Sequence, residues 1–283
     1  MRIKNADLQL VLTALRAQLR AIHAHERGAR AGRDPEDLHE MRVAVRRMRA
    51  ILRASRAMFE REWTEGLRGE LEWLGTALGR VRDLDVLLAS LQSRVKGLPA
   101  TERRIGAILL GDIEKDCARA RGRLRAALAG PRYRRLLRRL DAALRRPPVV
   151  EPDISLQDVA AKEFEKLRSA VKDLPERPED EDLHAVRIKV KRARYAAELV
   201  RETAGRPAER FLEQAKEVQD VLGNHQDSVV LERRLRETPE RSGDLRRVKK
   251  TLIGLERKRR NETRAAFREE WPKLKRRGRK AWS

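Results

Sequence analysis

Apolar residues recur every three or four positions along most of the chain, which is the spacing of one face of an α-helix. Alternating runs of β-branched residues are missing, and aromatic residues make up only 4% of the chain. The pattern therefore predicts an all-α protein built from helical bundles. We expect helices at 7–30, 38–59, 62–79, 84–96, 101–128, 133–144, 155–173, from Leu183 onward, at 207–222 and at 244–270.

Several predicted helix ends carry residues that favour an end. Asp34 offers an N-cap and Pro35 a first-turn proline to the second helix. Two similar segments, Leu78 to Val86 and Leu222 to Val230, each place a glycine directly after a leucine, and we expect both to interrupt their helices. Beyond the last helix, residues 272–280 are expected to form a basic tail.

The best linker in the chain is 147–153, because its three prolines cannot continue a helix. The linker separates two parts of similar size, each with its own set of amphipathic helices. We therefore expect two antiparallel helical bundles, the first formed by residues 1–147 and the second by residues 148–283.

The helix predicted at 38–59 carries its cations on one side. Arg42, Arg46, Arg49 and Arg53 follow His39 at helical spacing. At 100° per residue these five side chains fall within an arc of about 80°, and the apolar residues of the helix lie opposite. We call these five residues the first stripe.

A second stripe repeats the first in the other half of the chain, at His184, Arg187, Lys191 and Arg194. Each stripe is followed by a Leu-Gly-x-x-x-Asp segment: His39 lies 44 residues before Asp83, and His184 lies 43 residues before Asp227. Two motifs that both recur at nearly equal separation indicate an internal duplication with a period near 145 residues.

The composition points to a negatively charged partner. Lys and Arg number 67 against 44 Asp and Glu, which leaves a formal charge of +23, and the single Cys117 can form no internal disulfide. No apolar run approaches the roughly 18 residues of a membrane span, and the first residues carry charge where a signal peptide is apolar. We expect a soluble, cytoplasmic protein that does not associate with membranes.

The stripes differ from an ordinary solvated helix face, which mixes charges of both signs. Glu40 is the only acid between Leu38 and Phe59, and there is none between Ala185 and Ala197. Like charges one turn apart repel by a few tenths of a kcal/mol per pair, so the stripes need an anion or acids from another helix. The first stripe is about 21 Å long, which suits an extended polyanion better than one small ligand.

The histidines at the start of each stripe allow more than one interpretation. His39 and His184 lie near helix N-termini, where anions are favoured, so phosphate hydrogen bonding is our first interpretation, ahead of a structural role or metal ligation. A metal would need Asp83, Asp85 or Asp227, and these acids are expected instead to pair with arginines or to cap a helix. The sequence contains no Gly-rich phosphate loop and no nucleophile beside a base.

These motifs together resemble the CHAD family, the conserved histidine α-helical domain. The resemblance rests on Leu38-His39-x-x-Arg42-x-x-x-Arg46-Arg47-x-Arg49, on its copy at His184, and on Leu-Gly-x-x-x-Asp at 78–83 and 222–227. It implies two pseudo-symmetric bundles of about four helices that flank a basic groove or cavity. It also implies binding of inorganic polyphosphate, association with polyphosphate granules and no established enzymatic activity.

Carried over residue by residue, the resemblance assigns the polyphosphate surface to His39, Arg42, Arg46, Arg49, Arg53, His184, Arg187, Lys191 and Arg194, with Arg47, Arg192 and Lys189 as secondary candidates. We expect a binding protein that is not an enzyme and uses no metal or cofactor. Two alternatives stay open. One is a general polyanion-binding or nucleic-acid-binding protein, and the other is a metal-dependent phosphohydrolase that uses the histidines and aspartates.

Overall fold

The computed structural model describes residues 2–150, 155–240 and 242–282. Within these ranges it contains helices and one isolated bridge between Phe59 and Val149 but no strand, which confirms the all-α prediction. The helices are α1 (Arg2–Ala31), α2 (Pro35–Ala54), the 3₁₀ turn η1 (Arg56–Met58), α3 (Arg61–Lys96), α4 (Ala100–Ala129), α5 (Pro131–Arg145), α6 (Leu156–Lys172), α7 (Asp180–Leu199), α8 (Arg201–Glu237) and α9 (Gly243–Trp282).

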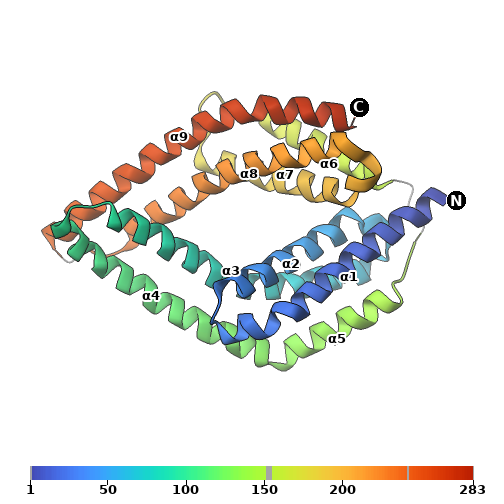
Figure 1. Cartoon of the computed structure of the whole chain (residues 1–283), viewed down its shortest axis with the longest axis horizontal. Helices are drawn as coiled ribbons and strands as arrows, with labels where there is room; N and C mark the ends of the chain where they lie inside the picture. The colour runs from blue at the N-terminus through green and yellow to red at the C-terminus, as the bar shows by residue number, and fades with distance from the viewer. Residues whose placement is uncertain (1, 151–154, 241, 283) are drawn as a thin grey trace.

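The order of neighbouring helices is the same in the two halves of the described chain. The helices α1 to α4 pack in succession, each against the next, and α6 to α9 do the same. Figure 1 shows these two groups as the lower and upper parts of an elongated molecule, with α5 along the lower edge. Helix α5 follows the first group and has no counterpart after α9 in the described residues.

The predicted interruptions at the two Leu-Gly-x-x-x-Asp segments are wrong. Helix α3 runs unbroken through Leu78 and Gly79, and α8 runs through Leu222 and Gly223. A glycine inside a helix costs only about 1 kcal/mol, and here neither segment contains a proline. Leu78, Gly79 and Leu222 are buried, so packing on both sides of each segment outweighs the weak local preference.

The predicted basic tail at 272–280 is also wrong, because α9 continues to Trp282. Pro272 lies inside the helix, and Leu274 and Gly278 beyond it are buried. A stripe of apolar contacts therefore holds this last part of α9 against α6 and α8. None of the helices in the described ranges combines the length and the apolar character that a membrane span requires.

Three apolar clusters form the core. The first lies among α1 to α5 and takes in residues at the start of α6 and Ala196 and Leu199 from α7. The second lies among α6 to α9. The third joins the distal parts of α3 and α4 to α8 and α9, with Leu91 and Leu231 among its members. The two groups of helices therefore meet at both ends of the molecule (Figure 1), and the division into 1–147 and 148–283 stays a prediction.

The described part of the predicted linker is fixed to the connection between α2 and α3. The backbone N–H of Val150 donates to the carbonyl of Met58 at 2.9 Å, and the N–H of Glu60 donates to the carbonyl of Pro148 at 3.1 Å. Residues 151–154 lie outside the described ranges. The first half of the linker thus holds the end of α5 close to the end of α2.

Candidate functional site

Local capping and an apolar face orient α2. The Asp34 side chain accepts a hydrogen bond from the backbone N–H of Glu36 at 2.8 Å, and Pro35 fills the first turn. The apolar side of the helix is buried in the first cluster, through Leu38, Met41, Ala44, Val45 and Met48. Because this side faces inward, the first stripe is turned toward α7.

Helix α7 is oriented in the same way in the other half. A capping box between Glu179 and Asp182 starts the helix, and Leu183, Val186 and Val190 are buried in the second cluster. Helices α2 and α7 pack against each other, although their sequences lie about one repeat apart. The duplication therefore brings the two stripes face to face.

Contacts between single residues join the two stripes. The Nε atom of Arg46 donates a hydrogen bond to the Tyr195 hydroxyl at 2.7 Å. Arg46 and Arg42 from α2 are close enough to Lys191 to act on its charge, as are Arg187 and Arg194 from α7 itself. Lys191 thus stands where the two stripes meet.

A groove of about 890 Å³ opens beside this meeting point. It lies between α2, η1 and part of α3 on one side and α6 and α7 on the other. Among its lining residues nine are Arg or Lys, and Glu163 is the only acid. The cations that line it are Arg46, Arg49, Arg53, Arg56, Arg68, Lys162, Lys166, Lys191 and Arg192.

The groove brings together part of the predicted set. Arg46, Arg49, Arg53 and Lys191 line it, and so does Arg192, which the sequence ranked as secondary. The other predicted residues, His39, Arg42, Arg47, His184, Arg187, Lys189 and Arg194, lie outside the lining. Whether these residues contact a ligand stays a prediction.

Several predicted residues outside the lining already have partners. Arg194 pairs with Glu198 at 3.1 Å, and Arg47 approaches the same carboxylate at 3.7 Å. The ring Nδ1 of His184 is hydrogen-bonded to the Gln226 side-chain oxygen at 2.7 Å. These contacts hold the side chains in place beside the groove.

Sequence reasoning missed four cations that line the groove. Lys162 and Lys166 lie one turn apart on α6, but Glu163 and Glu165 stand between them, so the helix reads as an ordinary mixed surface. Arg56 follows the end of α2, and Arg68 lies between Glu65 and Glu70 on α3. Only the tertiary packing of α6 against α7 and of α3 against α2 reveals them.

Acids from neighbouring helices neutralise part of the first stripe. Arg42 pairs with Asp83 at 2.9 Å, Arg49 with Glu72 at 3.0 Å, and Arg53 with Glu163 at 3.0 Å. The carboxylates of Asp83 and Glu72 are about two-thirds exposed, at 66% and 65%, so these two pairs are weak and easily exchanged. An anionic ligand can therefore replace these carboxylates.

The aspartates of the Leu-Gly-x-x-x-Asp segments interact with arginines. Asp83 pairs with Arg42, and the charge of Asp227 acts on Arg187, the corresponding residue of the second stripe. Asp85 pairs with Arg121 at 2.7 Å. The prediction that these acids pair with arginines is confirmed for Asp83 and Asp85.

Burial and crowding make the second stripe costly to keep charged. Burial, followed by the charges of Arg187, Arg46 and Arg42, lowers the pKa of Lys191 to about 7. Burial also lowers the pKa of Arg187 and raises the pKa of the Asp227 carboxyl. In the free protein, positive charge around Lys191 therefore exceeds negative charge. A bound anion would stabilise the charged forms of Lys191 and Arg187.

His39 is half-buried at the start of α2. Burial, with the charge of Arg82, lowers the pKa of His39, so its imidazole is neutral at pH 7. Ligand atoms of His39, Glu36 and Glu40 lie within 4.8 Å of one another. These three residues come from adjacent turns of one helix and include none of the aspartates that the sequence had offered as metal partners.

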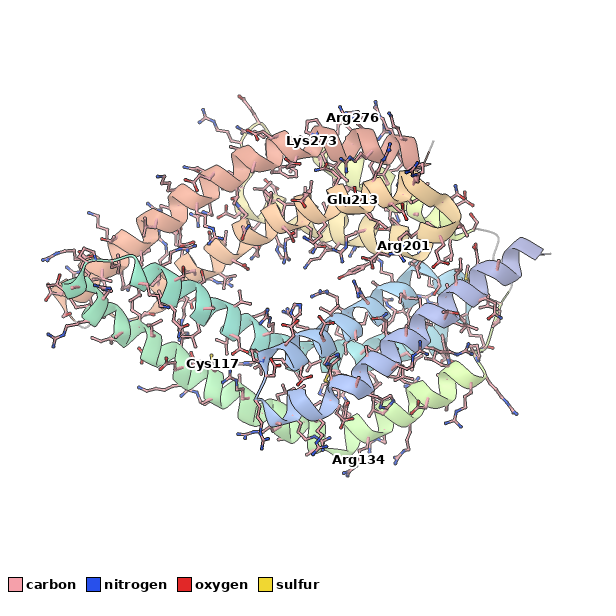
Figure 2. The ribbon with its side chains drawn as sticks, viewed as in Figure 1. Cys117, Arg134, Arg201, Glu213, Lys273 and Arg276 are labelled. Atoms are coloured by element: carbon pink, nitrogen blue, oxygen red, sulfur yellow. The ribbon has the colours of Figure 1, made fainter. Side chains whose placement is uncertain are left out.

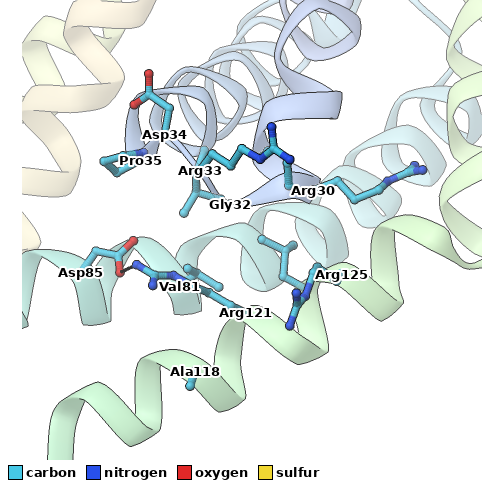
Figure 3. Close-up of a pocket in the computed structure, with 14 residues that line it drawn as sticks. Arg30, Gly32, Arg33, Asp34, Pro35, Val81, Asp85, Ala118, Arg121 and Arg125 are labelled. Carbon is cyan, nitrogen blue, oxygen red and sulfur yellow. Dashed lines mark hydrogen bonds and ion pairs between the residues drawn. The ribbon is translucent and has the colours of Figure 1, made fainter. Parts of the chain in front are cut away.

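A second, smaller hollow of about 450 Å³ lies between the end of α1, the start of α2, and α3 and α4. Figure 3 shows Asp85 and Arg121 pointing toward each other on the side of the hollow formed by α3 and α4. Its floor is apolar, with Leu38, Val81 and Leu124. Because its arginines share the hollow with Asp34 and Asp85, we place the candidate site in the larger groove.

Comparisons with known proteins agree with this architecture. A family model described as the CHAD domain matches residues 13–236. Two uncharacterized proteins from two strains of Mycobacterium tuberculosis are each 31% identical over 203 residues. That match covers 68% of this chain and 38% of theirs, so the chain spans about two fifths of the length of these relatives.

Two solved structures share the fold. PptA from Streptomyces chartreusis superposes with a TM-score of 0.77 at 22% identity, covering 93% of this chain and 98% of that one. The CHAD domain from the plant Ricinus communis superposes with a TM-score of 0.71 at 28% identity, covering 93% of this chain and 90% of that one.

Proposed function

The chain belongs to the CHAD domain family, and from that premise we propose that it binds inorganic polyphosphate in the groove between α2, α6 and α7. The observation that carries the proposal is the composition of the groove, in which nine cations face a single acid. A row of guanidinium and ammonium groups matches a chain that repeats one anionic phosphate along its length.

Binding would follow from charge exchange along the stripes. Phosphate oxygens accept charge-assisted hydrogen bonds from Arg46, Arg49, Arg53 and Lys191. The exposed carboxylates of Asp83 and Glu72 give up their arginines and turn toward solvent. Release of the cations condensed on polyphosphate adds a favourable entropy, so we expect affinity to fall steeply with salt.

We further propose that the protein is not an enzyme and needs no metal or cofactor for binding. Two facts support this: the largely buried Asp85 carboxylate pairs with Arg121, and the ring of His184 is hydrogen-bonded to Gln226. A protein that holds polyphosphate without cleaving it is suited to polyphosphate granules, where we propose that it accumulates.

Nucleic acid is the competing ligand. Single strands gain affinity by stacking bases on aromatic side chains, and Tyr195 is the only aromatic residue among those that line the groove. Its hydroxyl accepts the hydrogen bond of Arg46, which fixes the ring beside the stripe. We therefore expect nucleic acid to bind weakly, through charge alone.

A double charge reversal tests the proposed site. We expect Arg46→Glu with Lys191→Glu to lower polyphosphate affinity by about 100-fold or more, because each change replaces a charge-assisted contact with repulsion. Fluorescence anisotropy with labelled polyphosphate measures the affinity, and circular dichroism checks that helical content is kept.

The matched control reverses two exposed cations outside the groove, Arg104→Glu on α4 and Lys258→Glu on α9. It changes the net charge by the same amount, so its effect reports long-range charge only. Equal losses in the two double variants, or full affinity in the groove variant, would contradict the proposed site.

A further inference from the structure

Helix α5 carries a second basic surface. Tyr133, Leu136 and Leu140 are buried, and they fix one side of the helix against α1 and α3. The opposite side consists of arginines within an arc of about 160°, counted at 100° per residue. These exposed residues are Arg132, Arg134, Arg135, Arg138, Arg139 and Arg145, and we call them the α5 face.

The charges of the α5 face are poorly neutralised. Arg132 pairs with Glu70 at 3.0 Å and stacks over Trp73. Arg134 donates to a backbone carbonyl, that of Ala129, and Arg138 and Arg145 have no ion pair within the described parts of the chain. Like-charged residues one turn apart repel one another, so this surface is less stable without an anion than with one.

Asp141 is the only acid in α5 and its position increases the imbalance. It lies between Arg138 and Arg145 on the helix, where either could pair with it, yet its carboxylate approaches the ring Nε2 of His23 on α1, at 3.8 Å. The solvent-facing row formed by Arg134, Arg138 and Arg145 is thus left open over about 16 Å.

The α5 face points away from the groove. Figure 1 shows α1 and α2 between α5 and α7, and Figure 2 places Arg134 at the outer edge of the molecule, on the opposite side from Lys273 and Arg276. Helix α5 also has no counterpart in the second half of the described chain. The repeated architecture of the two bundles therefore does not explain this helix or its arginines.

We propose that the α5 face binds a second polyphosphate chain while the groove holds the first, so that one molecule bridges two chains. This inference rests on the proposed function of the groove. A flexible chain can follow a convex row of arginines, each guanidinium taking one phosphate through its fork of donors. Bridging would make the protein a cross-link within a polyphosphate mass, because each molecule adds a second attachment point.

The basic surface of α9 is the natural comparison. Its cations Lys273 and Arg277 lie beside Glu270 and Glu213, at 2.7 and 3.6 Å. Arg279 and Lys280 occupy the last turn of the helix, where the helix dipole favours positive charge without a ligand, and Arg276 lies one turn earlier. Substituting these three residues gives a control with the same loss of charge as substituting the solvent-facing row of α5.

The test captures the protein on beads that carry end-attached polyphosphate, washes them, and adds fluorescent polyphosphate of the same length. We expect the wild type to retain label on the beads. The triple variant Arg134→Gln, Arg138→Gln and Arg145→Gln should be captured nearly as well but retain about tenfold less label, because it keeps the groove and loses the second contact. The control Arg276→Gln, Arg279→Gln and Lys280→Gln should retain the label.

Each other outcome has a definite meaning. If the wild type is not captured at all, the proposed function of the groove fails. If it is captured but recruits no label, or if the two triple variants lose label equally, bridging through α5 is overturned while the groove stands. Recruitment of labelled duplex DNA or of anionic lipid vesicles in place of labelled polyphosphate would also overturn it.

Discussion

At Lys191, burial and repulsion from neighbouring cations act on the same side chain of the groove. It is half-buried, and this burial, followed by the charges of Arg187, Arg46, Arg42 and Arg194, lowers the pKa of its ammonium group. With a pKa of about 7 instead of 10.5, the side chain loses its proton just above neutral pH in the free protein. A bound polyanion would restore the charge, so binding and proton uptake are coupled.

We predict that polyphosphate affinity falls as the pH rises above 7. The bound form keeps Lys191 protonated while the free form has lost the proton, so binding takes up close to one proton per site. The logarithm of the affinity should then decrease with a slope approaching about −1 per pH unit between roughly pH 7.5 and 9.5. Isothermal titration calorimetry in buffers of different ionisation enthalpy measures the proton uptake directly.

Lys191→Arg is the control, because a guanidinium group stays charged throughout this range. This variant should bind at pH 7 and lose the pH dependence; an unchanged slope would show that another group takes up the proton. The folding stability of the free protein changes with pH in the direction opposite to the affinity. The unfolded chain binds more protons at Lys191 between pH 7 and 10.5, so this residue makes folding more favourable as the pH rises through that window.

Substitution of Asp83 distinguishes a binding protein from a phosphohydrolase. If it only holds Arg42, Asp83→Asn should raise polyphosphate affinity by up to about fivefold, because the ligand no longer displaces an exposed carboxylate. A phosphohydrolase that used Asp83 would instead lose phosphate release in this variant. Parallel binding and phosphate-release assays on the wild type, Asp83→Asn and the remote control Asp244→Asn distinguish the two cases.

At the scale of the element, the sequence predicted α2 and α7 well and α3, α8 and α9 less well. In α2 and in α7 the basic stripe and the apolar face lie on opposite sides of the helix. The sequence pattern therefore predicts both the presence of these helices and the side that each one buries. The breaks expected near Gly79 and Gly223 did not occur, since buried leucines on both sides hold each helix together. Local preference alone could not reveal those contacts.

At the end of α9, tertiary contacts extend the helix into residues that the sequence pattern predicted to be a tail. Gly278 lies against the buried ring of Phe164 on α6, and a Cβ atom there would come within 2.2 Å of the ring. Gly278→Ala should therefore destabilise the protein by about 1–3 kcal/mol through overpacking. Thermal unfolding followed by circular dichroism measures the loss.

Gly254→Ala on the same helix provides the comparison. This glycine is exposed and a Cβ atom would meet nothing within 4 Å, so alanine should stabilise the helix by up to about 1 kcal/mol. A melting temperature unaffected by Gly278→Ala would mean that this end of α9 is not packed against α6.

At the scale of the whole molecule, the duplication predicted from two motifs is visible as two equivalent successions of helices. The sequence could not show how those halves meet. The junctions depend on apolar residues such as Leu91 and Leu231, which look like any other core positions. The same limit hid Lys162 and Lys166, which become part of the groove only when α6 packs beside α7.

The measurement that tests the central claim most directly is a competition titration at near-physiological salt. Labelled long-chain polyphosphate is bound to the protein, unlabelled duplex DNA or single-stranded RNA is added, and the same samples are assayed for released phosphate. We predict tight binding that neither nucleic acid displaces at equal charge concentration, with no phosphate released. Equal affinity for all three polymers would contradict a polyphosphate-specific groove, and phosphate release would contradict a protein that only binds.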